Sequence, residues 1–297
     1  MVGKSGFVER NLKYIFPLPA LLFVFLLMIF PVCYTLFVSF TDWTLTSGRP
    51  MRFAGLQSYL RVIRETRFHE AIARTLIFTF GVVGVEAVFG TIIALILNRE
   101  FMGKGLLKFI LLLPLVVTPV AIGITFNLFY DPTIGFLNYV LSRLGLPQSG
   151  WVTEAQTVLP SLMLVDIWQW TPMIALIVLA GLSSLSSEPF ESAMVDGANG
   201  VQTFFRVTLP MIMPTVLTAI VLRSVDALKT YDIIAAMTRG GPGYSSETLN
   251  ILAFKLSFEY LSLGQASSAL VFLFLIVLFF SIGIMQIRKK FELGGEG

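Results

Sequence analysis

The chain has 297 residues, of which 56% are hydrophobic and only 13% charged, with a formal net charge of +3. A soluble domain carries about a quarter charged residues, so this composition indicates an integral membrane protein. The basic residues stand singly at the ends of apolar runs and form no stripe, which excludes an ordinary nucleic-acid-binding surface. Cys33 and His69 are the only cysteine and histidine, which excludes an intramolecular disulfide, a cysteine metal site and a histidine-based catalytic triad.

Six apolar segments are long enough to cross the roughly 20-residue core of a bilayer. They lie at about 15–40, 71–97, 106–130, 157–182, 209–230 and 267–287. The first follows Lys4, Arg10 and Lys13 as in a signal peptide, but its apolar run is much longer and no A-x-A site follows. We therefore expect an all-α membrane protein in which the first segment is retained.

The basic flanks of the spans predict the orientation. Six spans place both termini on one side, and Lys4 to Lys13, Arg288 to Lys290 and the short 98–105 loop indicate that this side is cytoplasmic. The count of Lys and Arg is ten inside and eight outside, so the termini and the short loop carry this prediction. The expected organisation is a cytoplasmic segment 1–14, a six-span domain 15–287 and a cytoplasmic tail 288–297.

The outside segments 41–70, 131–156 and 231–266 are too short to form separate domains. Within and just after the first of them, the sequence RFAGLQSYLRVIRETRFHEAIART can form an amphipathic helix on the membrane surface.

The inside loop at about 183–208 has a more specific pattern. Pro189 suits the first turn of a helix, and Glu191 in that turn complements the positive helix end. Gly197 can adopt the positive φ that ends a helix. A second short helix is expected through Phe204 and Phe205, so the loop should present two small helices at an angle, with small side chains and two carboxylates.

This loop resembles the cytoplasmic "EAA" motif, E-A-A-x-x-D-G-A followed by L-P, of the membrane subunits of binding-protein-dependent ABC importers. The matching residues are Glu191, Ala193, Asp196, Gly197, Ala198, Leu209, Pro210 and Pro214, and Ser192 replaces the middle alanine. Further segments are similar to the sugar-importer branch with maltose-permease-like subunits, among them FAGLQSY (53–59), LLPLVVTP (112–119), TRGGPGYSSETL (238–249) and GQASSAL (264–270).

The resemblance implies the type I ABC importer permease fold and a division of labour between subunits. Residues Glu191, Ser192, Ala193, Asp196, Gly197 and Ala198 would form a coupling helix in a cleft of an ATPase, with Glu191 and Asp196 as contact and capping charges and the small residues as clearance. The partners implied are a second permease subunit in a heterodimer, two ATPase subunits and a soluble or lipid-anchored sugar-binding protein. The location implied is the inner membrane of a bacterium or archaeon.

Cofactor binding is expected elsewhere. The segments VGKS and MGKG both lack the spacing of a phosphate-binding loop, so ATP and Mg²⁺ would be held by the ATPase and no cofactor by this chain. No catalytic residue and no metal site is predicted.

Polar residues inside the spans are the internal guide to a substrate pathway. Asp166, Gln169, Trp170 and Met173 share one face of the fourth span, where Pro172 is expected to kink the helix. In the fifth span Arg223, Asp226 and Thr230 share a face beside Tyr231. Aromatic faces beside carboxylates and amides suit a sugar.

A purely structural role is the alternative for these residues. Arg223 with Asp226, or Asp226 with Lys229, could neutralise each other at i, i+3. Glu86 stands alone in the second span and is interpreted as structural or partner-facing. A self-sufficient secondary transporter or channel is the alternative function, but no internal repeat supports it and it leaves the 191–214 segment unexplained.

Overall fold

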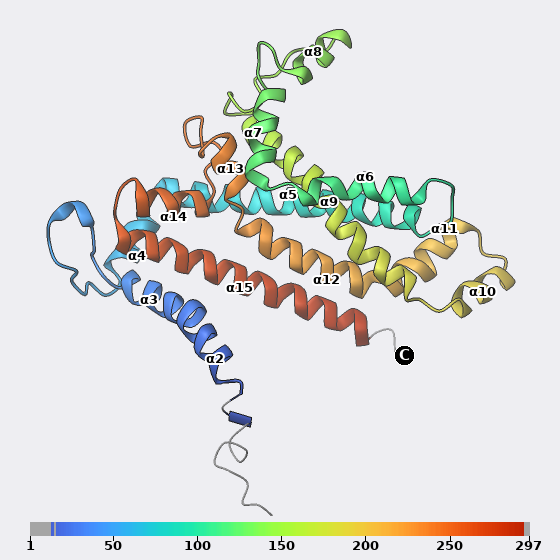
Figure 1. The fold of residues 1–297 in the computed structure, drawn as a ribbon, viewed down its shortest axis with the longest axis horizontal. Coiled ribbons are helices and arrows are strands. Elements are labelled where there is room, and N and C mark those ends of the chain that lie inside the picture. Colours follow the sequence, from blue (N-terminus) through green and yellow to red (C-terminus); the bar gives the residue numbers. More distant parts are fainter. Residues whose placement is uncertain (1–12, 15, 294–297) are drawn as a thin grey trace, which may run out of the picture. The chain divides into compact units, whose positions relative to one another are not determined.

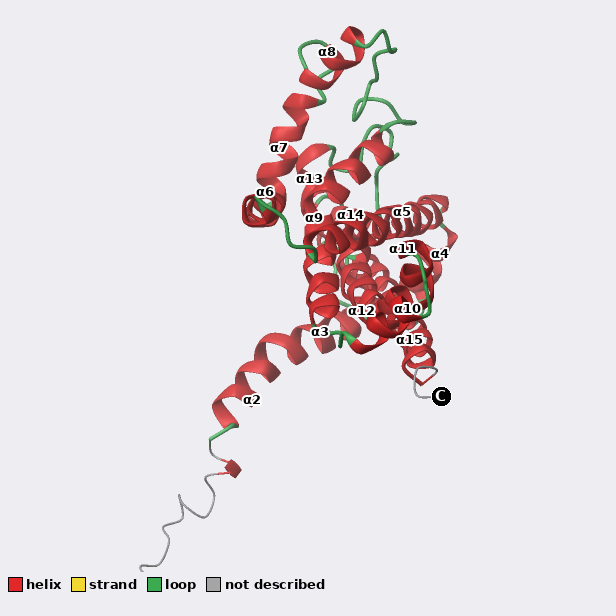
Figure 2. Ribbon diagram, turned by 90° about the vertical axis from the view of Figure 1, so that its right-hand side faces the viewer, coloured by secondary structure: helices red, strands yellow, loops and turns green. Residues whose placement is uncertain are grey.

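The computed structural model describes residues 13, 14 and 16–293. Residues 1–12 of the predicted N-terminal segment 1–14 and residues 294–297 of the predicted tail 288–297 therefore lie outside the described chain. The described part consists of helices and loops, with an isolated bridge between Thr41 and Phe53 (Figures 1 and 2). The α-helices are α2 (Leu18–Val24), α3 (Phe30–Ser39), α4 (Gln57–Arg64), α5 (Thr66–Leu97), α6 (Lys104–Val116), α7 (Pro119–Phe129), α8 (Phe136–Arg143), α9 (Val158–Ser183), α10 (Glu188–Val195), α11 (Gly200–Thr203), α12 (Leu209–Leu228), α13 (Asp232–Met237), α14 (Leu249–Phe258) and α15 (Leu263–Leu293).

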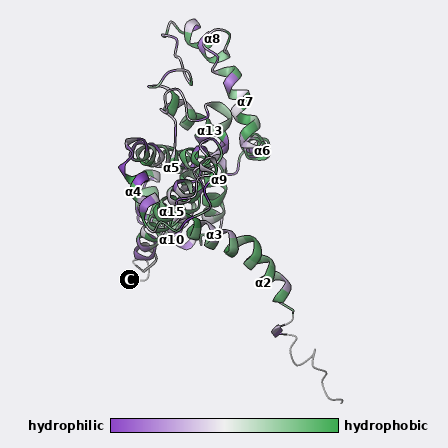
Figure 3. Cartoon of the chain, turned by 90° about the vertical axis from the view of Figure 1, so that its left-hand side faces the viewer, coloured by the Kyte–Doolittle hydropathy of each residue, from purple (hydrophilic) through white to green (hydrophobic). Residues whose placement is uncertain are grey.

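The long apolar helices correspond to the predicted spans and confirm the all-α membrane fold. Five helical stretches of the described chain are long and apolar enough to cross a bilayer: Leu18–Ser39, Thr66–Leu97, Val158–Ser183, Gly200–Leu228 and Leu263–Lys290. A sixth crossing is formed if the bent pair α6 and α7 counts as one span. Hydrophobic residues dominate α2 and α7 in Figure 3, as expected for segments that face lipid or other helices.

The third predicted span is not one continuous helix, which corrects the prediction. Helices α6 and α7 meet at an angle of 99°, and Figure 1 shows them running in different directions. Val117 and Thr118 adopt extended conformations between them, and Pro119 starts α7. A residue before proline is driven out of the helical region by the proline ring, so Pro119 imposes this break.

Two other spans contain a single π-helical turn that ends two residues before a proline. Phe25–Ile29 stands before Pro31 in the first span, and Phe204–Thr208 stands before Pro210 at the start of α12. Proline has no N–H and its ring clashes with the carbonyl four residues earlier, so the preceding turn widens to an i→i+5 bond. Pro172, by contrast, lies inside α9, which continues on both sides of it from Val158 to Ser183.

The chain forms two compact units. The first comprises the described residues up to Glu65 together with Ala253–Phe272, and the second comprises Thr66–Leu252 and the described residues from Leu273 onwards. In the second unit α5 packs most extensively against α9, and α12 packs against both. A Cβ at Gly90 would lie 2.8 Å from Cγ2 of Ile174, so the absence of a side chain there lets α5 and α9 approach closely.

Candidate functional site

Arg223 is the centre of a buried ion cluster in the second unit. Its side chain is 1% exposed, and its Nε and Nη2 donate to the two carboxylate oxygens of Glu86 at 2.8 and 3.2 Å. Nη2 also donates to Asp166, and the guanidinium carbon lies 5.2 Å from the ring centroid of Trp170. Glu86 is fully buried and Asp166 is 2% exposed. Because α5, α9 and α12 each contribute one charge, the cluster ties three spans together.

Of the two ion pairs considered from the sequence, the structure contains Asp226 with Lys229 but not Arg223 with Asp226. Arg223 pairs with Glu86 and Asp166 rather than with Asp226, whereas Asp226 pairs with Lys229 at 3.6 Å and both side chains are about half exposed. Glu86 thus has a structural partner 137 residues away along the chain. The position of Glu86 alone inside a span did indicate a partner on another span, because an isolated charge there requires one. Sequence spacing could only suggest partners on the same helix.

The cluster forms one wall of a pocket of about 540 Å³. The lining residues are Pro119, Asp166, Gln169, Trp170, Arg223, Asp226, Lys229, Thr230, Tyr231, Asp232 and Ile233. Seven of the eight residues predicted for the substrate pathway are therefore brought to one place, and Met173 is the one that does not line this pocket. Pro119, Asp232 and Ile233 were not singled out from the sequence, and Lys229 was considered only as an ion-pair partner of Asp226.

Gln169 connects this pocket to the break in the third span. Its Nε2 donates to the carbonyl oxygen of Val117 at 3.3 Å, which satisfies a backbone group freed by the break between α6 and α7. The Oε1 atom of Gln169 is buried and has no hydrogen-bond partner among the described residues. A buried acceptor without a partner is costly, so a movement of the Gln169 side chain that brings Oε1 to a hydroxyl or water donor in the pocket would be favoured.

The lining of the pocket combines rings with polar groups of both signs. Asp226 and Lys229 are half exposed at its rim, and Trp170 and Tyr231 supply aromatic rings. Aromatic rings cover apolar C–H faces, and carboxylates, amides and hydroxyls supply both acceptors and donors. A polyhydroxylated molecule has this alternation of C–H faces and hydroxyl groups.

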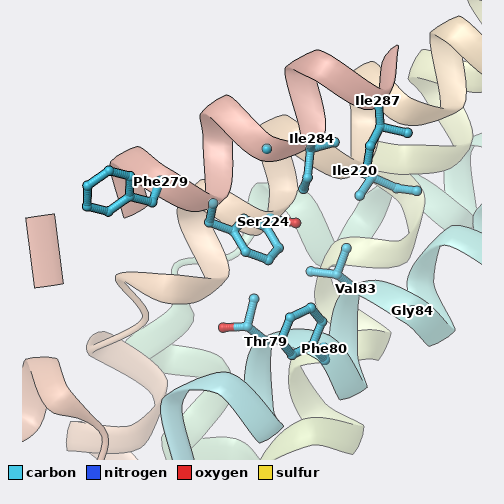
Figure 4. A pocket seen from close by; sticks show the side chains of 11 residues that line it. Thr79, Phe80, Val83, Gly84, Ile220, Ser224, Phe279, Ile284 and Ile287 are labelled. Carbon is cyan, nitrogen blue, oxygen red and sulfur yellow. The ribbon is translucent and has the colours of Figure 1, made fainter. Parts of the chain in front are cut away.

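A second pocket, of about 460 Å³, has a different character. It lies between α5, α12 and α15, and its lining is nearly all apolar, with Phe80, Val83, Ile220 and Ile284 among the side chains in Figure 4. Thr79 and Ser224 contribute its hydroxyl groups. This surface resembles the lipid-facing lining of a span more than a site for a polar solute.

The inside loop forms the first short helix expected from its sequence, α10, whereas the expected second one, through Phe204 and Phe205, is the first part of the continuous helical stretch Gly200–Leu228. Helix α10 has Pro189 in its first turn together with the acidic Glu188 and Glu191. It ends where the N–H of Gly197 bonds to the carbonyl of Met194 at 3.1 Å and that of Ala198 bonds to Ala193 at 3.0 Å. These two bonds define a Schellman motif. Gly197 has φ +73°, as predicted for the residue that turns the chain.

The cap of the following helix comes from a pair that the sequence analysis did not single out. The Asn199 side chain accepts from the N–H of Gln202, and the Gln202 side chain accepts from the N–H of Asn199, both at 2.9 Å. This capping box starts α11, which leads into α12. Capping was expected from Asp196, which instead occupies the C-cap position of α10.

The exposed surface of this loop is apolar as well as acidic. Met194 and Val195 are 68% and 88% exposed, while Glu191, Ser192 and Asp196 are also exposed. Ala193 is only 8% exposed and faces inward, so it does not supply the outer clearance that the sequence analysis expected of the small residues. A large exposed aliphatic pair on a short helix is typical of a contact with another protein.

Comparisons with known proteins agree with this organisation. The family model described as "Binding-protein-dependent transport system inner membrane component" matches residues 86–290. The trehalose/maltose transport system permease protein MalF of Thermococcus litoralis is 33% identical over 293 residues, which cover 97% of each chain. The sulfoquinovosyl glycerol transport system permease protein SmoG of Agrobacterium fabrum is 32% identical over 266 residues, covering 90% of this chain and 86% of that protein.

The fold is also found in a solved structure. A chain of the bacterial alginate ABC transporter, crystallised with an alginate pentasaccharide-bound periplasmic protein, superposes with a TM-score of 0.82 at 20% sequence identity. The match covers 95% of this chain and 96% of that chain.

Proposed function

Because the chain belongs to the family of binding-protein-dependent transport system inner membrane components, we propose that it conducts a sugar through the pocket beside Arg223. The relatives named above transport trehalose, maltose and sulfoquinovosyl glycerol, which are all carbohydrates or carbohydrate derivatives. A self-sufficient transporter or channel is disfavoured, since this family depends on a binding protein.

The pocket itself supports this proposal. Residues chosen from two different spans by their chemistry converge on one cavity, and one of them, Gln169, has a buried acceptor without a partner. When the Gln169 side chain turns toward the pocket, a sugar hydroxyl can donate to that acceptor, and the rings of Trp170 and Tyr231 can cover the C–H faces of the sugar. Arg223 is neutralised by Glu86 and Asp166, so its role in this proposal is to hold the walls of the pocket.

The loop at 183–208 supplies the connection to ATP hydrolysis in this proposal. Met194 and Val195 would enter a cleft of the ATPase, and the exposed Glu191, Ser192 and Asp196 would contact its rim. Helix α10 follows α9, which carries Asp166 and Gln169, and α11 leads into α12, which carries Arg223. Movement of α10 would therefore be transmitted to both walls of the pocket, which is the basis of alternating access.

The proposed assembly contains a second permease subunit as a heterodimeric partner, two ATPase subunits that bind ATP and Mg²⁺, and a sugar-binding protein. In this proposal the 183–208 loop and both termini lie in the cytoplasm of a bacterial or archaeal cell, and the binding protein lies on the opposite side of the inner membrane.

The test is to reconstitute the chain with its ATPase, second permease and binding protein, and to measure sugar-stimulated ATP hydrolysis and uptake. Trp170→Ala and Gln169→Ala should lower uptake at least tenfold while basal hydrolysis and assembly persist. Met173→Ala is the matched control, because Met173 lies on the same helix but does not line the pocket. Equal effects of all three variants would contradict the pocket assignment.

Coupling requires a separate variant. Val195→Asp places a charge on the most exposed apolar residue of α10 and should abolish sugar-stimulated hydrolysis without preventing membrane insertion. Failure of the chain to associate with any ATPase would overturn the proposed function as a whole.

A further inference from the structure

Helix α4 in the first unit has three distinct faces. At 100° per residue, Ser58 and Val62 lie on one face, and each is 1% exposed. A second face holds Leu56, Leu60 and Ile63, which are 61%, 50% and 39% exposed. The third face is polar and basic. A helix with one buried face and a further exposed apolar face needs a second apolar neighbour.

The position of α4 is set by contacts with the end of the first span. The hydroxyl groups of Tyr59 and Ser39 are 2.6 Å apart, and Ser58 Oγ donates to the carbonyl of Thr41 at 2.7 Å. The first span runs from Leu18 to Ser39, 22 residues, which gives a length of about 33 Å against a hydrocarbon core of about 30 Å. Ser39, and with it α4, therefore lies at the boundary between hydrocarbon and headgroups.

The basic face of α4 and the loop before it carry charge that is only partly compensated within the described residues. Arg61 forms a two-pronged pair with Asp42 at 2.5 and 3.2 Å, which fastens α4 to the preceding loop. Arg52 and Arg64 are exposed and have no ion-pair partner among the described residues. A guanidinium presents a planar fork of donors that matches a phosphate group.

We propose that α4, with Arg52 and Arg64, is an interfacial anchor that binds the phosphate groups of anionic phospholipids in the leaflet at the Ser39 end of the first span. Lipid chains cover Leu56, Leu60 and Ile63, while the two arginines reach the headgroups beside them. An amphipathic helix with adjoining apolar and basic faces at this depth is the arrangement that binds anionic membrane surfaces. The anchor also accounts for arginines at a span end where basic residues are not needed to set topology.

The first experiment measures depth in the full chain. Leu60→Cys in a Cys33→Ser background is labelled with bimane and placed in nanodiscs whose lipids carry a nitroxide either at the headgroup or deep in the acyl chain. Leu60 should be quenched most strongly from the headgroup, whereas Leu26→Cys, in the middle of the first span, should be quenched from the deep position. Quenching of the Leu60 label only by aqueous iodide would overturn the proposal.

The second experiment measures charge selectivity. The full chain is taken from nanodiscs of phosphatidylcholine with phosphatidylglycerol, and the retained lipids are identified by native mass spectrometry. Wild type should prefer phosphatidylglycerol, and Arg52→Gln/Arg64→Gln should reduce that preference by about fivefold per arginine, about 25-fold in total. Arg52→Lys/Arg64→Lys should retain only part of it, because lysine keeps the charge but not the planar fork of donors.

Two controls separate the outcomes. Arg143→Gln/Arg239→Gln removes the same charge from exposed positions outside α4 and should leave the lipid preference unchanged. An equal loss in this control would reduce the effect to net charge and contradict a site at α4. Release of the lipid by millimolar glycerol phosphate would assign the arginines to a soluble anion and would also overturn the proposal.

Discussion

Replacement of Arg223 by methionine tests the buried ion cluster most directly. Arg223→Met keeps much of the side-chain volume but leaves Glu86 and Asp166 without their cation, at 0% and 2% exposure. Breaking a buried pair by removing one partner costs about 3–5 kcal/mol, because the remaining charge stays desolvated. The apparent melting temperature of the purified chain in detergent should therefore fall by roughly 6–15 °C, at about 2–3 °C per kcal/mol.

Two further variants make this result specific. Arg223→Met/Glu86→Gln/Asp166→Asn removes all three charges and should recover most of the loss, since neutral polar groups of similar volume replace the unpaired carboxylates. Lys229→Met breaks a pair in which both side chains are half exposed and should change stability by no more than about 1 kcal/mol. If Arg223→Met and Lys229→Met melted at the same temperature, the cluster would not be the structural tie described here.

Three other outcomes are expected. Gly197→Val should abolish sugar-stimulated ATP hydrolysis while insertion persists, because a β-branched residue at φ +73° costs about 1–3 kcal/mol, although its Cβ would meet no atom within 4 Å. Asparagine tolerates this conformation, so Gly197→Asn should retain most coupling. Unchanged transport in the valine variant would contradict the lever role. Gly90→Ala should destabilise the chain by about 1–3 kcal/mol because its Cβ would lie 2.8 Å from Ile174, whereas Gly84→Ala in the same helix meets no atom within 4 Å and should be neutral or slightly stabilising in thermal melts. The hydrogen bond from Arg61 holds the pKa of Asp42 below its ordinary value. This pair should therefore stabilise the fold above about pH 4 and lose its contribution as the pH falls through the lowered pKa. Both groups are more than a third exposed, so Asp42→Asn should remove less than about 1 kcal/mol of that acid-dependent stability.

The membrane class, the position of the spans and the loop between the fourth and fifth spans could be predicted from the sequence because each depends on local rules. Apolar runs of about 20 residues are read from composition alone. The turn at Gly197 follows from the residue types of one short segment, and the structure has it with the expected sign of φ. The break before Pro119 is also a local effect of proline on the preceding residue, but the apolar length of 106–130 indicated only a single span.

What only the tertiary structure decided is which distant residues meet. The pairing of Arg223 with Glu86 and Asp166 joins three spans, and nothing in the local pattern distinguishes it from the pairs available at i, i+3 on one helix. The same holds for Gln169, whose partner is a backbone carbonyl exposed by a bend in another span. Helix periodicity determines which face a side chain occupies, but the choice of the facing helix depends on packing between segments far apart in the chain.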